Sequence, residues 1–330
     1  MTRPASARRR ADAAPRRPVS RSSRAEASPA QHISAAQLVP VAVLALVWGI
    51  NWPVLKLGVT EIAPLTFRAL TLPFAALGLL AIARATGDSI RVPRPLWAKV
   101  ALLGVANITV WNGLLLFGLQ QLPAGRSAII AFTMPIWSVL FSLALLHEPL
   151  SGRRIAGLAL GMLGMGVLLG DDIGHIQRAP TAALLVLGAA ICWALGTVLL
   201  RKWKPPLPQT ALTGWMMLLG WIPLAALAPF FSGQPLRSPS AAGWFALVYN
   251  MFLAGTLAHW AWYSLARTLP VAVSSMSSLP VPIVGVFSGM LLLGERPGLG
   301  EWTALALVVA AMVGVLWVPK PPVVTPAPDN

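Results

Sequence analysis

The stretch SVLFSLALLHEP (Ser138–Pro149) is an apolar run that stops abruptly at the letters HEP. A second stretch, VFSGMLLLGERP (Val286–Pro297), has the same form far downstream. When Leu122–Glu148 is placed over Leu269–Glu295 without a gap, nine of the 27 positions are identical. The matches include two prolines and a glutamate in register, which a shared apolar composition does not easily explain. The chain therefore contains an internal duplication.

Two constant offsets describe this duplication. An offset of 147 residues relates Asn112 to His259, and an offset of 145 residues relates Trp48 to Trp193. The glutamates that close the opening stretches also match, and since they follow apolar runs we expect them to act at helix ends or in loops.

The chain is far more apolar than a soluble protein. Of its 330 residues, 56% are hydrophobic and only 11% are charged, whereas a soluble domain has about a quarter of its residues charged. One soluble core cannot bury so much apolar surface, but a lipid bilayer can act as its solvent. The single cysteine, Cys192, excludes an internal disulfide and a metal site built from several thiolates.

Ten segments are long and apolar enough to cross a bilayer, which takes about 20 residues of helix. Short connections rich in glycine, proline and charge separate them. The segments are residues 38–57, 64–83, 97–117, 125–146, 153–170, 181–201, 209–230, 244–264, 271–293 and 300–318. We therefore predict an all-α integral membrane protein with ten transmembrane helices.

The duplication divides these helices into two repeats of five, residues 38–170 and 181–318. Because five is odd, the second repeat enters the membrane from the opposite side, and the two five-helix repeats are predicted to be inverted. Inverted repeats are typical of secondary transporters, whose substrate site lies near the bilayer midplane between the repeats.

The charged residues predict the orientation. Residues 1–37 hold eight arginines against two acids and should form a disordered tail, with a second tail at 319–330. With both tails inside, the inner segments hold 19 Lys and Arg and the outer segments hold six. This asymmetry predicts cytoplasmic termini in a cell (inner) membrane. The arginine tail also fits a segment that binds anionic lipids, and it shares features with a transit peptide.

Three motifs carry a resemblance to a known family. The chain has VWGINWPVLKLG in the first span, PLTFRAL at the start of the second and LLLGERP at the end of the ninth. In their order, and with the repeat, they resemble the EamA type of the drug/metabolite transporter superfamily over roughly residues 38–318. The resemblance implies a central cavity walled by spans one to four and six to nine. It also implies a transporter, most often an exporter, of amino acids, related metabolites or small toxic compounds.

Aromatic and amide side chains recur at helical spacing within the spans and predict a substrate site. Such side chains suit organic molecules with flat or apolar parts and polar ends. The alternatives are interfacial belts for tryptophan and packing for histidine and serine. The candidate residues are Trp48, Asn51, Trp52, Asn107, Trp111, Asn112, Asn250, His259, Trp262, Tyr263 and Ser275.

Two prolines occupy equivalent positions in spans four and nine. Pro135 and Pro282 each remove a backbone donor, so both helices are expected to kink. The kink either borders the central cavity, where the freed carbonyl is satisfied, or is a static packing feature.

Few ionisable residues fall inside the spans. All ten acids lie in tails, loops or span ends, so the sequence offers no buried carboxylate relay. His259 lies in the middle of a span and could couple transport to protons, with facilitated diffusion as the alternative. Lys56 and Arg68 flank the first outer connection, where they could attract anionic groups or extend to the interface.

Other functions remain open at this point. A carrier of nucleotide-sugar-like or lipid-linked solutes, or an importer, could share the architecture, although phosphorylated cargo calls for several cations within the cavity. An intramembrane enzyme lacks paired catalytic groups here, and a channel lacks a ring of charges. The expected partners are a small-molecule substrate and membrane lipids, with a homodimer left open. We expect no cofactor, no metal site and no nucleic acid.

Overall fold

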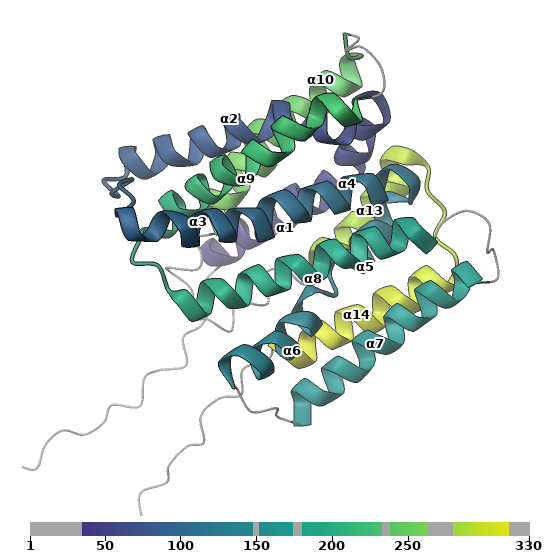
Figure 1. Ribbon diagram of the computed structural model, residues 1–330. Coiled ribbons are helices and arrows are strands. Elements are labelled where there is room, and N and C mark those ends of the chain that lie inside the picture. The colour runs from purple at the N-terminus through teal and green to yellow at the C-terminus, as the bar shows by residue number, and fades with distance from the viewer. Residues whose placement is uncertain (1–34, 148–151, 174–179, 233–237, 263–279, 317–330) are drawn as a thin grey trace, which may run out of the picture. The chain divides into compact units, whose positions relative to one another are not determined.

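The computed structural model describes residues 35–147, 152–173, 180–232, 238–262 and 280–316. Every regular element in these ranges is helical (Figure 1). The predictions for both tails, apart from residues 35–37, and for Glu148, Tyr263 and Ser275 lie outside the described residues.

The helices follow the expected spans closely. They are α1 (Ala35–Glu61), α2 (Pro64–Ala85), η1 (Arg94–Leu96), α3 (Trp97–Gly104), η2 (Val105–Val110), α4 (Trp111–Gln121), α5 (Ala124–Ala131), α6 (Met134–Leu146), α7 (Gly152–Ile173), α8 (Pro180–Trp203), α9 (Gln209–Phe231), α10 (Ala241–Val248), η3 (Tyr249–Leu257), α13 (Pro280–Leu293) and α14 (Leu299–Leu316). α1 begins three residues before the expected start at 38, so residues 35–37 are helix and not tail.

Seven of the described helical runs are long and apolar enough to cross a membrane, and three shorter apolar helices accompany them. The shorter ones are Ile155–Gly164, Pro280–Leu293 and Leu299–Gly314. The first part of the expected ninth span, residues 271–279, lies outside the described residues. The structure therefore supports a helical membrane protein without by itself fixing ten crossings.

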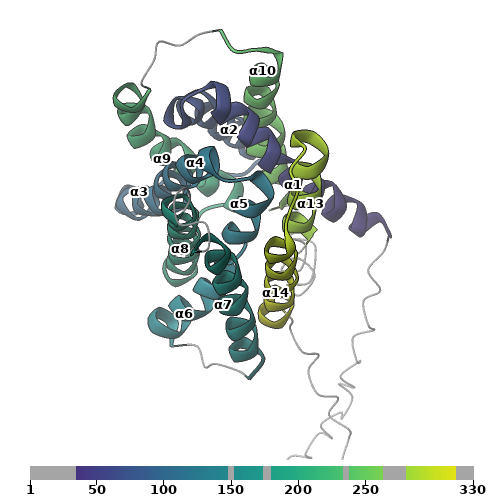
Figure 2. The same ribbon diagram turned by 90° about the vertical axis from the view of Figure 1, so that its right-hand side faces the viewer.

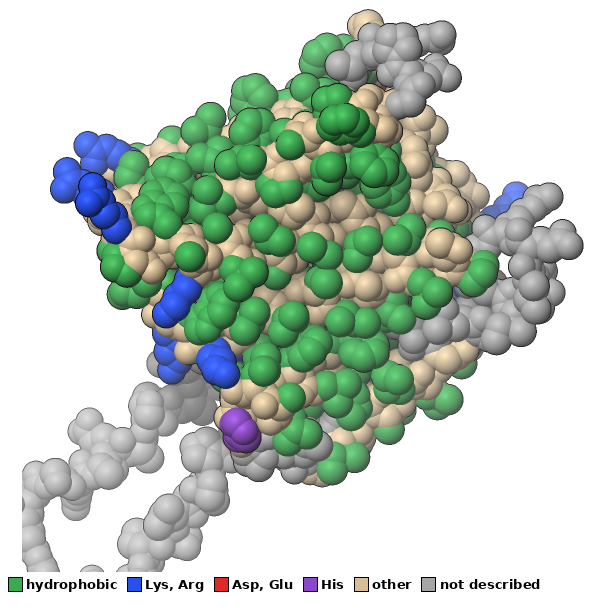
Figure 3. Space-filling view, in the orientation of Figure 1, with side chains coloured by type: hydrophobic (Ala, Val, Ile, Leu, Met, Phe, Trp, Pro, Cys, Tyr) green, Lys and Arg blue, Asp and Glu red, His purple; other side chains and the backbone are tan. Residues whose placement is uncertain are grey.

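The surface of the described helices is apolar, as a lipid solvent requires. Phe230, Leu291 and Leu299 each expose more than four-fifths of their surface. Figure 3 shows hydrophobic side chains spread over the visible face between the helix ends. In water such a surface would drive aggregation, whereas hydrocarbon solvates it.

Helices of each half pack mainly against helices of the other half. α1 packs against α13, and α8 packs against α5 and α6. α4 contacts α8 while α10 contacts α1, and η3 contacts α2 while η2 contacts α9. The two remaining main pairs, α2 with α9 and α7 with α14, each join a helix to its own counterpart. Figures 1 and 2 show α7 and α14 side by side at one edge of the bundle. Each of these contacts joins the first half of the chain to the second.

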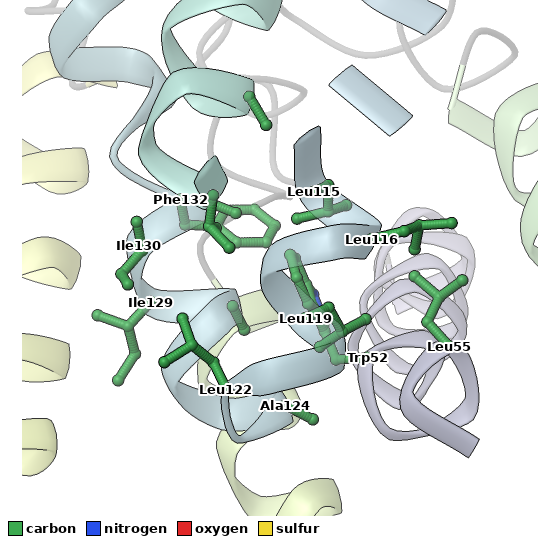
Figure 4. Close-up of a cluster of buried hydrophobic side chains, with 14 of the residues drawn as sticks. Trp52, Leu55, Leu115, Leu116, Leu119, Leu122, Ala124, Ile129, Ile130 and Phe132 are labelled. Carbon is green, nitrogen blue, oxygen red and sulfur yellow. The ribbon is translucent and has the colours of Figure 1, made fainter. Parts of the chain in front are cut away.

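The interior is packed by aliphatic and aromatic side chains. Figure 4 shows one such cluster, in which Trp52 and Leu55 of α1 meet side chains of α4 and α5. In lipid, close packing of small residues replaces the hydrophobic drive between helices. A Cβ added at Gly104 would lie 2.7 Å from the Met216 carbonyl oxygen, so α3 and α9 approach too closely for alanine.

The two ends of the bundle differ. Lys and Arg side chains gather at one end, on the left in Figure 3. We call it the basic end; its residues are Arg84, Arg91, Arg94, Lys99, Arg201, Lys202 and Lys204. The other end contains the turns at residues 62–63 and 122–123 and the segment 294–298, and we call it the clasped end.

Candidate functional site

Two π-helical segments interrupt the bundle at corresponding places. η2 lies between α3 and α4, and η3 follows α10. The repeat offset of 147 carries residues 105–110 onto 252–257, which lie within η3. π-helical turns are rare and occur frequently at functional sites. The candidate residues of the third and eighth spans therefore lie in or beside these segments.

A cluster of rings joins α1 to the end of the eighth span. The ring centroid of Trp48 lies 5.3 Å from that of His259, at an interplanar angle of 74°. It lies 5.8 Å from that of Trp262. His259 Nδ1 lies 2.9 Å from the Ala254 carbonyl oxygen. Because a carbonyl only accepts, this ring nitrogen carries a hydrogen in this arrangement. Trp48 Nε1 donates to the same oxygen at 3.4 Å.

The other half carries a related aromatic contact. The rings of Trp111 and Trp193 lie 5.0 Å apart. Trp193 is the repeat counterpart of Trp48, and Trp111 precedes the counterpart of His259 by one residue. Trp193 was absent from the sequence candidates, although the offset of 145 residues already indicated it.

Trp52 occupies a different environment from Trp48. Only 6% of its surface is exposed, and its ring lies 6.3 Å from that of Phe132. A Cβ added at Gly285 would meet the indole at 3.2 Å, so Trp52 fills the contact between α1 and α13. The structure therefore places it in the packed interior.

The three buried asparagines each make the same kind of hydrogen bond to the backbone of their own helix. Each side-chain amide nitrogen donates to the carbonyl four residues earlier, at 3.1 Å for Asn107, 2.8 Å for Asn112 and 3.0 Å for Asn250. The amide oxygen of Asn51 is buried and accepts no hydrogen bond within the described part of the chain.

Arg68 corrects an expectation. Instead of extending to the interface, its side chain turns inward and is 8% exposed. Its Nη1 donates to Asn250 Oδ1 at 3.1 Å, which links α2 to η3. The sequence signal was an arginine five residues into an apolar helix. We read it as a residue of the outer connection because long basic side chains usually reach the nearest interface.

Lys56 also differs from expectation, because backbone groups bind it. Its Nζ donates to the carbonyl oxygens of Leu119, Gln120 and Leu122 at 2.8, 2.8 and 2.9 Å. These carbonyls end α4, where a helix leaves its last acceptors without internal partners. Lys56 therefore caps α4 and is neither free at the mouth nor extended to the lipid interface.

Glu295 serves the next helix in the same way. Its carboxylate accepts from the backbone N–H groups of Ala124 and Gly125, at the start of α5. The carboxylate is favoured there by the positive end of the helix dipole. The expected helix-end role is thus confirmed for Glu295.

The two prolines expected to kink their helices lie near the described starts of α6 and α13. α5 ends at Ala131, and Pro135 is the second residue of α6 after a turn. Pro282 is the third residue of α13. Pro135 therefore occupies a first turn, where the missing N–H costs no internal hydrogen bond, while the residues before Pro280 lie outside the described part of the chain.

Two cavities lie near the ends of the bundle. One of about 840 Å³ opens at the basic end among α6, α8 and α9, and Arg201, Lys202 and Lys204 line it together with leucines. A small one of about 100 Å³ lies at the clasped end beside Arg126 and Glu295. Within the described residues, no group of three or more His, Cys, Asp or Glu side chains could hold a metal ion.

Known proteins resemble the chain over most of its length. The inner membrane transporter YedA of Escherichia coli K12 is 29% identical over 88% of this chain and 96% of its own. A protein of the same organism named as a probable amino-acid metabolite efflux pump is 27% identical over 77% of this chain and 85% of its own. The transporter YoaV of Bacillus subtilis is 24% identical over 77% of this chain and 87% of its own.

A solved crystal structure has the same fold. It covers 85% of this chain and 96% of its own, with a TM-score of 0.61 and 21% identity. The model of the EamA-like transporter family matches residues 38–170 and 180–317, which together make up most of the sequence. With its apolar helices, the chain is a membrane protein and belongs to the EamA-like transporter family.

Proposed function

We propose that this chain is a secondary transporter that exports a small organic metabolite, an amino acid or related compound or a drug-like molecule, across the cell (inner) membrane. It works by alternating access between two inverted five-helix repeats, residues 38–170 and 181–318. Both termini and the basic end face the cytoplasm in this proposal.

The observation that carries the proposal is that helices of each half pack against helices of the other half. A site between two equivalent halves can open to one side when they adopt one pair of shapes and to the other side when they exchange shapes. The π-helical segments η2 and η3 and the two aromatic contacts recur at related positions, which supports the same pairing.

The side chains of the site favour an organic molecule with an apolar part. Trp48, His259 and Trp262 form a face of rings, and Asn51 adds an acceptor that has no partner within the described residues. Relatives named for amino-acid metabolite efflux support export of such compounds. Tyr263 and Ser275 remain proposed members of the site.

Nucleotide-sugar-like and lipid-linked cargo form the second candidate class, and import is the alternative direction. Phosphorylated cargo calls for several buried cations. Arg68 is a buried cation within the described helices, and no other Lys or Arg there is as deeply buried. A single such group favours a singly charged cargo.

The test is a binding screen followed by transport. Purified protein is screened by thermal shift against amino acids and aromatic metabolites, and stabilising compounds are then followed in liposomes in both directions. Trp48→Ala and Trp111→Ala should each weaken binding about tenfold, since stacking and burial of a ring contribute about 1–2 kcal/mol. Trp244→Ala is the control, because Trp244 is half exposed on α10. Absence of flux for every stabilising compound would contradict the function.

Proton coupling is tested separately. His259→Ala should abolish flux driven by a pH gradient and leave flux down a substrate gradient. If flux driven by a pH gradient persists in His259→Ala, His259 does not couple transport to protons.

A further inference from the structure

Arg68 lies deep in the membrane-spanning part of the protein. Asn250, its hydrogen-bond partner, is the tenth residue of the helical run that begins at Ala241. At about 1.5 Å per residue, Asn250 lies about 14 Å along that run, close to half of a hydrocarbon layer about 30 Å thick. Arg68 itself is the fifth residue of α2, about 6 Å from the start of that helix, so its guanidinium lies inside the hydrocarbon layer, where ionised side chains are costly and usually functional.

No described carboxylate neutralises this charge. The acids whose side chains the structure describes are Glu61, Asp88, Glu295 and Glu301, and none of them pairs with Arg68. The Phe67 ring, 5.7 Å from Arg68 Cζ, is a further described contact of the charge. An aromatic face attracts a cation but does not neutralise it.

One edge of the guanidinium has no hydrogen-bond partner among the described residues. Arg68 uses Nη1 for Asn250, whereas Nε is buried and has no hydrogen-bond partner among the described residues. The edge formed by Nε and Nη2 makes no described hydrogen bond. A carboxylate binds such an edge through two parallel N–H···O bonds, which is the geometry that arginine favours.

The fold does not require this charge. The offsets of 145 and 147 carry Arg68 onto Thr213 and Asn250 onto Leu103, in the equivalent contact between the seventh and third spans. Thr213 satisfies its hydroxyl within its own helix by donating to the Gln209 carbonyl. The second copy of this contact thus packs without any buried ion. Packing alone therefore does not explain Arg68, and binding of the transported molecule would.

We infer that Arg68 binds a carboxylate of the transported molecule, which rests on the proposed function of a metabolite carrier. Asn250 is a positioning residue: its amide nitrogen is held by the Ala246 carbonyl, and its oxygen holds Arg68 Nη1. Trp48 and His259 pack against the same η3 run and take the apolar part of the cargo. The substrate class is therefore monocarboxylates with an aromatic or aliphatic side chain.

Specificity follows from the buried charge. A site with a buried, incompletely bonded donor rejects an analogue that lacks the matching acceptor, because the donor then stays unpaired. The amide of an amino acid keeps its size and its side chain but loses the anionic group. Carboxylate and amide probes of equal shape therefore isolate the contribution of Arg68.

The experiment measures thermal shift in detergent and flux in liposomes with two matched pairs of probes. The pairs are L-phenylalanine with L-phenylalaninamide and L-leucine with L-leucinamide. At least one acid should stabilise the wild-type protein, with its amide at least tenfold weaker. Arg68→Met should remove this preference, and Asn250→Ala should weaken acid binding about tenfold. Trp244→Ala should change neither response.

Asn250→Asp keeps the inference testable if Arg68→Met does not fold. The new carboxylate would lie 3.1 Å from Arg68 Nη1, where the amide oxygen now is, and would occupy the guanidinium from within. The variant should fold normally and lose acid binding. Equal response of the wild-type protein to acid and amide, response to neither, or an unchanged preference in Arg68→Met or Asn250→Asp would overturn the inference. Binding of the acid without any flux would instead contradict the proposed function alone.

Discussion

The clasped end and the basic end of the bundle are built from different interactions. At the clasped end, long-range side-chain bonds tie α1, α4, α5 and α14 to one another through Lys56, Glu295 and Arg126. Glu61 also accepts from the backbone and hydroxyl of Ser240, just before α10. At the basic end, by contrast, cations line a cavity of about 840 Å³.

This difference bears on the conformation of the proposed carrier. Bonds between helices that are distant in sequence hold the clasped end together, while the basic end leaves room between α6, α8 and α9. For the proposed carrier, we take this conformation as one open toward the basic end. Opening the other side requires the bonds of the clasped end to break, so each of them should affect stability and the balance between states.

The largest effect is expected at Lys56. Lys56→Met leaves three carbonyls at the end of α4 without their charged donor. Hydrogen bonds to charged groups contribute about 1.5–3 kcal/mol each and are not additive here, so we expect a loss of about 3 kcal/mol in the free energy of unfolding. Unfolding in mixed micelles measures it. Lys99→Met, an exposed change at the basic end, is the control, and an equal loss in both variants would contradict the comparison.

Glu295 should have the next largest effect. Glu295→Gln removes the charge and one of two acceptors at the start of α5, which should cost about 1–2 kcal/mol. Gly289→Ala tests the same contact independently, because an added Cβ would lie 2.5 Å from the Glu295 carboxylate. Arg296→Gln, an exposed neighbour, should change little.

Glu295→Gln and Gly289→Ala should also change access to the cavity at the basic end. Leu146 lines the cavity at the basic end, so Leu146→Cys reports its accessibility once Cys192→Ala has removed the native thiol. Weakening the clasped end should favour the opposite state and slow thiol labelling at position 146. An unchanged labelling rate in Glu295→Gln and Gly289→Ala would show that the clasped end does not control the cavity.

The sequence was sufficient for the helices and insufficient for their internal breaks. Apolar runs and turn residues place the helix ends within a few residues because lipid demands continuous apolar segments. The segments η2 and η3 were not predicted. They depend on packing against partners that a local pattern does not contain.

The candidate site was predictable in part for the same reason. Helical spacing predicted that Trp48 shares a helix face with other candidates, and the structure adds its contacts with His259 and Trp262. The direction of a long side chain is another matter, because Arg68 can reach either the interface or the interior from one backbone position. Its partner, Asn250, is 182 residues away in sequence, and no periodicity connects the two.

A smaller effect is expected from the ion pair of the clasped end. Arg126 Nη1 lies 3.2 Å from Glu301 Oε1, with 11% and 19% of the two side chains exposed. Pairs near the surface contribute up to about 1 kcal/mol. A double-mutant cycle of Arg126→Gln and Glu301→Gln should therefore give a coupling energy of about 0.5–1 kcal/mol that falls as salt is raised. A coupling energy above that of the Glu295 contacts would reverse the order proposed here.

Effects of similar size are expected at the two copies of one turn. His147 and Gly294 are related by the repeat offset, and both follow a helix in the left-handed conformation, with φ of 55° and 66°. Glycine adopts this conformation without the steric cost of a Cβ, although it loses more entropy on folding.

The net change in stability should therefore be small and of opposite sign at the two positions. His147→Gly at the end of α6 should stabilise by about 0.5 kcal/mol, and Gly294→His at the end of α13 should destabilise by about 1 kcal/mol. Gly294 also directs the chain into Glu295, so its replacement should disturb the contacts at the start of α5, whereas His147→Gly should leave them intact. Loss of stability in His147→Gly would mean that the imidazole itself makes a contact that glycine cannot replace.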